Sequence, residues 1–185
     1  GPVVITEIMY HPADQPDAEY VELLNISDAA VTLYDAETQL PWRFTDDPQD
    51  PAIELLFPSD PPVTLAPGQY LVLAKDLSLL NSRYAVPAGV LVLAWNIGRL
   101  TNGNEKVQLS RPFAVEDEGK IEWIRVDRIS YSDGSHPQDF ATGVDPWPIE
   151  ADGRGKSLHR IDPQAYGNDP ENWRAAVPSP GRANP

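Results

Sequence analysis

The chain has 185 residues and no cysteine, and its 28 acidic against 14 basic side chains give a formal net charge of −14. This length suffices for one domain with a hydrophobic core, while the missing cysteines exclude disulfides, thiolate metal sites and cysteine nucleophiles. Because an acidic surface repels nucleic acid, and no apolar stretch approaches the ~20 residues of a membrane-spanning helix, we expect neither a nucleic-acid partner nor membrane insertion.

Proline sets the expected fold class. The 20 prolines are spread from Pro2 to Pro185, and proline is excluded from helix interiors and central strands, so regular elements must be short. Between the prolines lie strand-length runs rich in β-branched and aromatic residues, at 3–10, 19–26, 30–34, 53–57, 69–74, 89–95, 105–110 and 120–131. With turn signals such as Asn102-Gly103 between them, this pattern is typical of an all-β sandwich.

Two runs are apolar without alternation, at 70–74 and 90–93. We expect both to be interior strands that are covered on both sides. Helices should be few. One short helix is expected after Asp76, and Asp169 before Pro170 has the pattern of an N-cap followed by proline at the first helical position.

Several stretches, taken in order, resemble the lamin-tail domain in the form found in large bacterial secreted and surface proteins. They are VVITEIMYHP at 3–12, EYVELLNISDAAVTL at 19–33, LAPGQYLVLAKD at 65–76, RYAVP at 83–87, LTNGNEKVQLS at 100–110, VDRISY at 126–131, WPIEADGRGKSLHRIDP at 147–163, NDPENWRAA at 168–176 and PSPGRANP at 178–185. The resemblance implies a single domain over 3–185, with an immunoglobulin-like β-sandwich of about 8–10 strands and one or two short helices. Gly1 and Pro2 are interpreted as residues that were added for expression of the protein and lie outside the domain.

The stretch DGRGKSL at 152–158 contains the end of a phosphate-binding loop but not its beginning. A P-loop needs glycine five residues before the Gly-Lys-Ser ending, and that position is Glu150. The preceding residues are also proline-rich and acidic rather than a buried strand. We therefore expect a turn with permissive positions at Gly153 and Gly155, followed by a strand.

No pattern of a catalytic site is found around the three histidines, His11, His136 and His159. A hydrolytic triad needs a serine beside a carboxylate-oriented histidine, and the adjacency of Ser135 and His136 in sequence does not provide it. Paired-histidine spacing for zinc is also missing. We expect no catalytic residue and no cofactor, and ordinary hydrogen bonds for the histidines.

Acidic side chains are the one abundant type of metal ligand, and calcium prefers six to eight oxygens. Two groups are candidate calcium ligands, Asp46, Asp47 and Asp50 in one loop and Asp145, Glu150 and Asp152 in another. Neither has EF-hand spacing, and acidic loops are commonly only solvated.

Aromatic side chains offer a second type of binding surface. The five tryptophans are Trp42, Trp95, Trp123, Trp147 and Trp173. Trp123 shares one strand face with Arg125, so these two residues are the candidate contact surface.

The sequence thus favours a non-catalytic module that mediates protein–protein contact or spacing within a larger bacterial protein at the cell surface or outside the cell. Its partners would be other domains of the parent protein or another protein. The alternative is a ligand-binding accessory domain for carbohydrate or calcium, and a free-standing hydrolase is least favoured.

Overall fold

The structure, a computed structural model, describes residues 1–116 and 119–185 and is mostly β, with 37% of residues in strands and 9% in helices. Several sheets form, an arrangement compatible with an all-β sandwich. The strands are β1 (Val3–Met9), β2 (Tyr20–Asn25), β3 (Val31–Thr32), β4 (Tyr34–Asp35), β5 (Leu40–Pro41), β6 (Arg43–Thr45), β7 (Glu54–Leu56), β8 (Thr64–Leu65), β9 (Tyr70–Ala74), β10 (Leu91–Ala94), β11 (Glu105–Val115), β12 (Ile121–Tyr131), β13 (Ser157–Arg160) and β14 (Trp173–Ala176). The helices are α1 (Leu77–Arg83) and the 3-10 turns η2 (Pro137–Asp139), η3 (Ile149–Ala151) and η4 (Pro170–Asn172).

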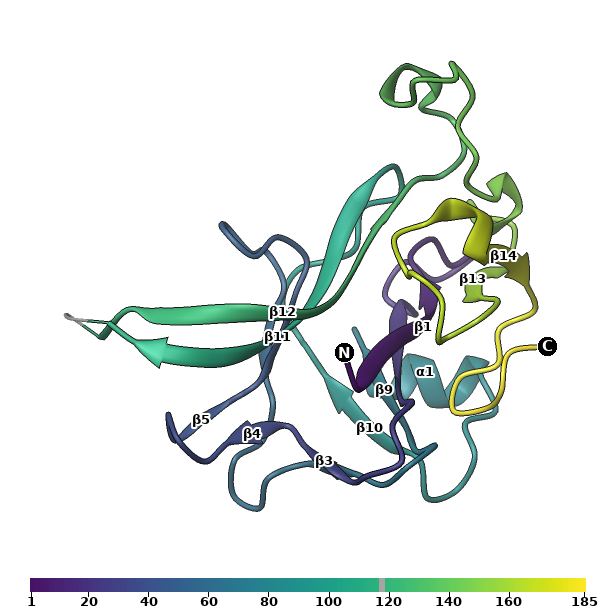
Figure 1. The fold of residues 1–185 in the computed structure, drawn as a ribbon. Helices are drawn as coiled ribbons and strands as arrows, with labels where there is room; N and C mark the ends of the chain where they lie inside the picture. Colours follow the sequence, from purple (N-terminus) through teal and green to yellow (C-terminus); the bar gives the residue numbers. More distant parts are fainter. Residues whose placement is uncertain (117–118) are drawn as a thin grey trace.

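The larger sheet has six strands in the order β10-β9-β2-β1-β13-β14 (Figure 1). All neighbouring pairs are antiparallel except β9 and β10. Parallel neighbours need a crossover connection, and α1 lies in it. The second sheet has four strands in the order β12-β11-β6-β7, while β3 with β8 and β4 with β5 form two-stranded ribbons. These two-residue strands raise the number of strands above the expected 8–10.

The main core joins both large sheets. Ile5 and Val21 of the larger sheet belong to the same cluster of buried side chains as Phe44, Leu109 and Ile129 of the second sheet. A smaller cluster on the larger sheet includes Leu80 of α1. Both faces of the central strands are therefore covered, which explains why β2 shows no clear alternation of apolar and polar residues.

One expectation about the core is wrong. Leu71, Val72 and Leu73 of β9 are fully buried as predicted, but Leu91 of β10 is 37% exposed. The reason is position, because β10 is the edge strand of the larger sheet and has only one neighbour. A continuous apolar run therefore does not distinguish an interior strand from an edge strand.

The β11–β12 hairpin is longer than expected because β11 continues through 111–115, where it pairs with residues 121–124 of the strand expected at 120–131. Among the described residues, the strand pairing of this part is confined to the hairpin, since β6 pairs with β11 only from Gln108 to Ser110. Figure 1 shows it extending from the body of the molecule as an arm.

The expected turns and caps are present. Gly153 and Gly155 have positive φ, +62° and +74°, and β13 follows them. Asp76 caps α1 by accepting hydrogen bonds from the N–H groups of Ser78 and Leu79. Asp169 caps η4 in the same way.

Candidate functional site

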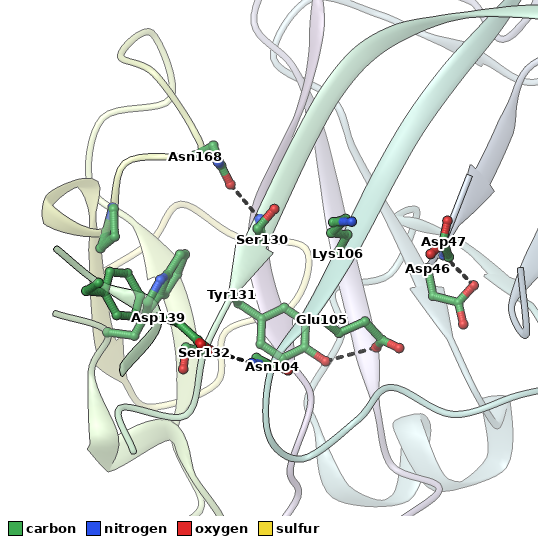
Figure 2. Close-up of a pocket in the computed structure, with 13 residues that line it drawn as sticks. Asp46, Asp47, Asn104, Glu105, Lys106, Ser130, Tyr131, Ser132, Asp139 and Asn168 are labelled. Carbon is green, nitrogen blue, oxygen red and sulfur yellow. Dashed lines mark hydrogen bonds between the residues drawn. The ribbon is translucent and has the colours of Figure 1, made fainter. Parts of the chain in front are cut away.

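A cavity of about 570 Å³ opens beside the first residues of β11 and the last residues of β12 (Figure 2). Its walls also come from the loop after β6, from η2 and from the segment that precedes η4. The lining residues are Asp46, Asp47, Asn104, Glu105, Lys106, Ser130, Tyr131, Ser132, Asp139, Phe140, Trp147, Asn168 and Pro170. We call this cavity the acidic pocket, because four carboxyl groups line it against one lysine.

The carboxyl groups of the acidic pocket lack basic partners. Within residues 1–116 and 119–185, none of Asp46, Asp47, Glu105 and Asp139 forms an ion pair. Asp46 is only 4% exposed. One of its oxygens accepts a hydrogen bond from the N–H of Asp47 at 2.6 Å, and the other makes none with the described residues. A carboxylate that is largely desolvated and unpaired has a high affinity for a positive group.

Glu105 is the second acid that the fold holds firmly. Its Oε2 accepts hydrogen bonds from the N–H of Thr101 at 2.9 Å and from the hydroxyl of Tyr131 at 3.1 Å. Burial raises the pKa of Glu105 to about 7, and the charges of Asp46 and Asp47 add to the rise, while the two hydrogen bonds oppose it. Figure 2 shows its side chain directed towards the side of the pocket where these aspartates lie.

Aromatic side chains close the acidic pocket from behind. Tyr131 is 1% exposed and stacks on Tyr10 with ring centroids 4.8 Å apart. Trp147, 4% exposed, packs on Trp173. The walls therefore keep their shape without a ligand, as in a preformed binding site.

A second polar cluster adjoins the pocket at Ser132. Asp133, His136 and Asp145 place possible ligand atoms within 4.8 Å of one another. However, the cluster is already hydrogen-bonded internally. Asp145 accepts from the hydroxyl of Ser132 at 2.5 Å and the N–H of His136 at 3.0 Å, and the imidazole Nδ1 lies 3.0 Å from Asp133. These contacts order the loop, and they do not by themselves indicate a metal.

The cluster is also not a hydrolytic relay. Ser132 Oγ lies 3.4 Å from His136 Nδ1, the same nitrogen that faces Asp133. A relay needs the serine and the carboxylate on opposite ring nitrogens. Ser135, the neighbour in sequence, donates its N–H to Asp133.

The two predicted calcium triplets are not assembled. Among the described residues, neither triplet brings its ligand atoms together as the cluster of Asp133, His136 and Asp145 does. In the first triplet, Asp46 and Asp47 line the acidic pocket, but Asp50 is exposed and lies outside it.

In the second triplet, each acid has a different environment. Asp145 belongs to the cluster of Asp133 and His136, Glu150 is exposed, and Asp152 lies 2.5 Å from Nδ1 of His11. The sequence grouped these residues because they are close in the chain, whereas in the structure Asp145 and Asp152 have different hydrogen-bond partners.

The predicted contact pair is also divided. Trp123 is half-buried beneath the guanidinium of Arg43, which lies 4.2 Å from the ring centroid. Arg125 is exposed and lines a different pocket, described below. The other four tryptophans are buried, so the tryptophans do not form an exposed aromatic platform of the kind that sugars use.

One buried constellation has the residue types of a catalytic relay. Ser157 Oγ lies 2.8 Å from Nε2 of His159, and Nδ1 of His159 lies 2.9 Å from Oδ1 of Asn184. Asn184 donates its amide N–H groups to two carbonyls, so its oxygen accepts from Nδ1. Ser157 also donates to Glu7 at 2.5 Å.

This constellation is sealed. Ser157, His159 and Glu7 are each 0% exposed, so no substrate reaches them. The C-terminal segment 177–185 covers it and contributes the N–H of Ser179 to Glu7. The contacts therefore tie the end of the chain to the sheet. His159 makes hydrogen bonds, as expected, but within a larger network than the sequence suggested.

Sequence reasoning missed Glu105, Tyr131 and Asp139 as pocket residues. Their local signal is weak: Glu105 follows the Asn102-Gly103 turn and begins a strand, and Tyr131 ends the paired strand. The register of β11 and β12 places Glu105 opposite Tyr131. An acid and an aromatic residue at the matched ends of an expected hairpin could have suggested their contact.

Comparisons with known proteins add no family or relative. A scan against models of protein families finds no match, and a search of curated proteins finds none at the level of similarity required. The described helices include none that is both long and apolar enough to cross a membrane. The resemblance to the lamin-tail domain therefore stays a prediction from the sequence.

Proposed function

We propose that this chain is a non-catalytic interaction module whose acidic pocket accepts a lysine or arginine side chain of a partner protein. The observation that carries the proposal is the set of four carboxyl groups without ion-pair partners among the described residues, in a cavity of about 570 Å³. An incoming ammonium or guanidinium group would supply the missing positive charge, and the aromatic wall would pack against its aliphatic stem.

Asp46 and Glu105 are the residues expected to contribute most to binding. Asp46 has an oxygen without a partner in the described chain, and Glu105 lies close enough for the negative charges of Asp46 and Asp47 to raise its pKa. A bound cation would relieve the repulsion between these acids. Burial of the pair strengthens the attraction, since the effective dielectric constant is lower than at an open surface.

The experiment compares two short peptides, acetylated and amidated, with one central lysine or one central norleucine among glycines. Calorimetry or NMR titration should detect binding of the lysine peptide and weaker or no binding of the norleucine peptide, which lacks only the charge. Asp46→Asn keeps the shape and the acceptor for the N–H of Asp47, and it should weaken lysine binding by about tenfold.

Asp28→Asn is the matched control, because Asp28 is exposed, lines none of the pockets described and changes the net charge equally. It should leave the affinity nearly unchanged. Equal binding of the lysine and norleucine peptides, or equal weakening by Asp28→Asn and Asp46→Asn, would contradict the proposed role of the pocket.

The family, the finer fold and the location belong to the same proposal. The order of the matching stretches across the chain supports a lamin-tail domain, and two large sheets that share one core are compatible with its immunoglobulin-like sandwich. A parent protein that is secreted or held at the bacterial surface follows from that resemblance. The Ser157 and His159 pair is fully buried, so this pair does not offer a reacting group to a substrate.

A further inference from the structure

A second cavity lies directly beside the acidic pocket. It has a volume of about 420 Å³, and Ser130 and Asn168 line both cavities. The N–H of Ser130 donates to Oδ1 of Asn168 at 2.5 Å, so this hydrogen bond is a bridge between the two. Figure 2 shows the bridge at the margin of the acidic pocket, away from Asp46 and Asp47.

The charge of the second cavity is opposite in sign. The charged side chains that line it are those of three arginines and one aspartate, Arg125, Arg128, Arg160 and Asp127. On a chain of net charge −14 this is an unusual local excess of positive groups. We call this cavity the basic pocket.

Two of these four charged side chains neutralise each other. Asp127 Oδ2 lies 2.9 Å from Nη1 of Arg160 and also accepts the N–H of Ile5 at 2.9 Å. Arg160 is 3% exposed and donates to the carbonyls of Ile5 and Ala165. This pair is therefore structural, and it fixes the floor of the basic pocket.

The other two arginines keep free positive charge. Neither Arg125 nor Arg128 forms an ion pair within the described part of the chain. Arg125 is exposed. Arg128 is anchored by its Nε, which donates to Gln108 at 2.7 Å, while its terminal nitrogens make no hydrogen bond to described residues. An anchored guanidinium with free terminal N–H groups is well suited to a carboxylate.

We propose that the basic pocket binds a carboxylate of the same partner segment whose basic side chain enters the acidic pocket. The inference rests on the proposed function and adds the chemical class of the ligand, a peptide segment with one basic and one acidic side chain near each other. Such a segment would place each charge against its opposite, on either side of the bridge between Ser130 and Asn168. A segment with two basic residues would meet repulsion from Arg125 and Arg128.

The test uses pairs of lysine peptides that differ by glutamate or glutamine, with the second residue one to four positions from the lysine. At the best spacing the glutamate peptide should bind about fivefold more tightly than its glutamine counterpart, as expected for an added ion pair at a partly exposed site. The best spacing then reports the separation of the two pockets.

Substitutions in the basic pocket test whether the preference for the glutamate peptide arises there. Arg125→Gln should reduce the preference for glutamate and leave the affinity for the glutamine peptide unchanged, whereas Arg125→Lys should retain part of the preference. Arg128→Lys keeps the charge near Gln108 and should also reduce the preference, because the forked donor geometry is lost. Arg154→Gln is the control, since Arg154 is exposed and lines neither pocket.

The outcomes separate the two proposals. If the lysine peptides bind but glutamate gives no advantage at any spacing, or if Arg154→Gln reduces the preference as much as Arg125→Gln, the basic pocket does not bind the partner's carboxylate. If no lysine peptide binds the unmodified protein, the proposed role of the acidic pocket is wrong, and the inference built on it is overturned as well.

Discussion

Glu7 and Glu22 lie directly opposite each other in the register of β1 and β2, and both are fully buried. Like charges in that arrangement repel, so we expect at most one of the two carboxyl groups to be ionised at a time. Glu7 accepts three hydrogen bonds through its Oε1, from the hydroxyls of Tyr20 and Ser157 and from the N–H of Ser179. Glu22 accepts hydrogen bonds from the hydroxyl of Thr6 and the N–H of Gly181, and the N–H of Arg182 also acts to lower its pKa. Burial outweighs these hydrogen bonds and favours the uncharged form of Glu22, so we expect this acid to retain a proton.

This assignment predicts how stability depends on pH. Burial, and then the charge of Glu7, raises the pKa of Glu22 from 4.5 to about 8. Between those values the unfolded chain ionises this group while the folded protein keeps it protonated, so the free energy of unfolding falls as the pH rises. Glu22→Gln removes this contribution, and the loss of stability between pH 5 and pH 8 should shrink by on the order of 2 kcal/mol.

Denaturant unfolding at pH 5, 6.5 and 8 measures the change. Glu37→Gln is the control, because Glu37 is exposed and its carboxyl group makes no hydrogen bond with the described residues. A slope with pH that is the same for Glu22→Gln and the unmodified protein would show that Glu22 is ionised in the folded state.

Strands are the elements that the sequence predicted best. The β-branched and aromatic runs at 3–10, 19–26 and 69–74 became β1, β2 and β9 with small changes at their ends. Short strands such as β6 and β14 were missed because three or four residues carry too little alternation to be recognised. The length of the arm formed by β11 and β12 was underestimated, because the first strand was expected to end before Pro112. Edge strands, however, accept proline.

The binding pockets could not be predicted in the same way. The sequence identified Asp46, Asp47 and Arg125 as residues of interest, but it grouped the acids with their neighbours in the chain. The acidic pocket instead joins segments around residues 46, 105, 131 and 168. Contacts over such separations depend on sheet register and on loop paths, and local propensity contains neither.

The C-terminal segment behaves as a structural element although it has no regular secondary structure. The side chain of Asn184 donates hydrogen bonds to the carbonyls of Thr6 and Arg160, and its oxygen accepts one from the ring of His159. Asn184→Ala removes these three hydrogen bonds and leaves buried groups unpaired. The free energy of unfolding should fall by about 2 kcal/mol, as measured by denaturant titration.

Hydrogen exchange gives an independent measure of the same effect. In Asn184→Ala the amides of Ser179 and Gly181, which donate to Glu7 and Glu22, should exchange faster. Asn102→Ala, in an exposed turn, should change neither stability nor exchange at these amides. Unchanged exchange in Asn184→Ala would mean that the segment is held by its other contacts.

At the scale of the whole molecule, the net charge of −14 dominates. Repulsion among exposed acids destabilises the compact state, and salt screens it over a Debye length of about 10 Å at 0.1 M. The midpoint of thermal unfolding should therefore rise when sodium chloride is increased from 10 mM to 300 mM. The rise should be similar for sodium and choline chloride.

Calcium chloride at matched ionic strength tests the remaining metal hypothesis in the same experiment. If calcium acts only by screening, calcium chloride and sodium chloride at the same ionic strength should raise the midpoint of thermal unfolding equally. A larger rise with calcium that Asp145→Asn abolishes would instead identify the cluster of Asp133, His136 and Asp145 as a calcium site, since a ligand of the native state stabilises it by mass action.

The contact between segment 179–184 and the first strands has a consequence for synthesis. Glu7 and Glu22 leave the ribosome 172 and 159 residues before the backbone N–H groups that they bind, those of Ser179 and Gly181. Until those residues emerge, the two carboxyl groups lack these partners and favour contact with water. The nascent chain is therefore expected to keep the carboxyl groups of β1 and β2 in contact with water. It should bury them only when this late segment arrives.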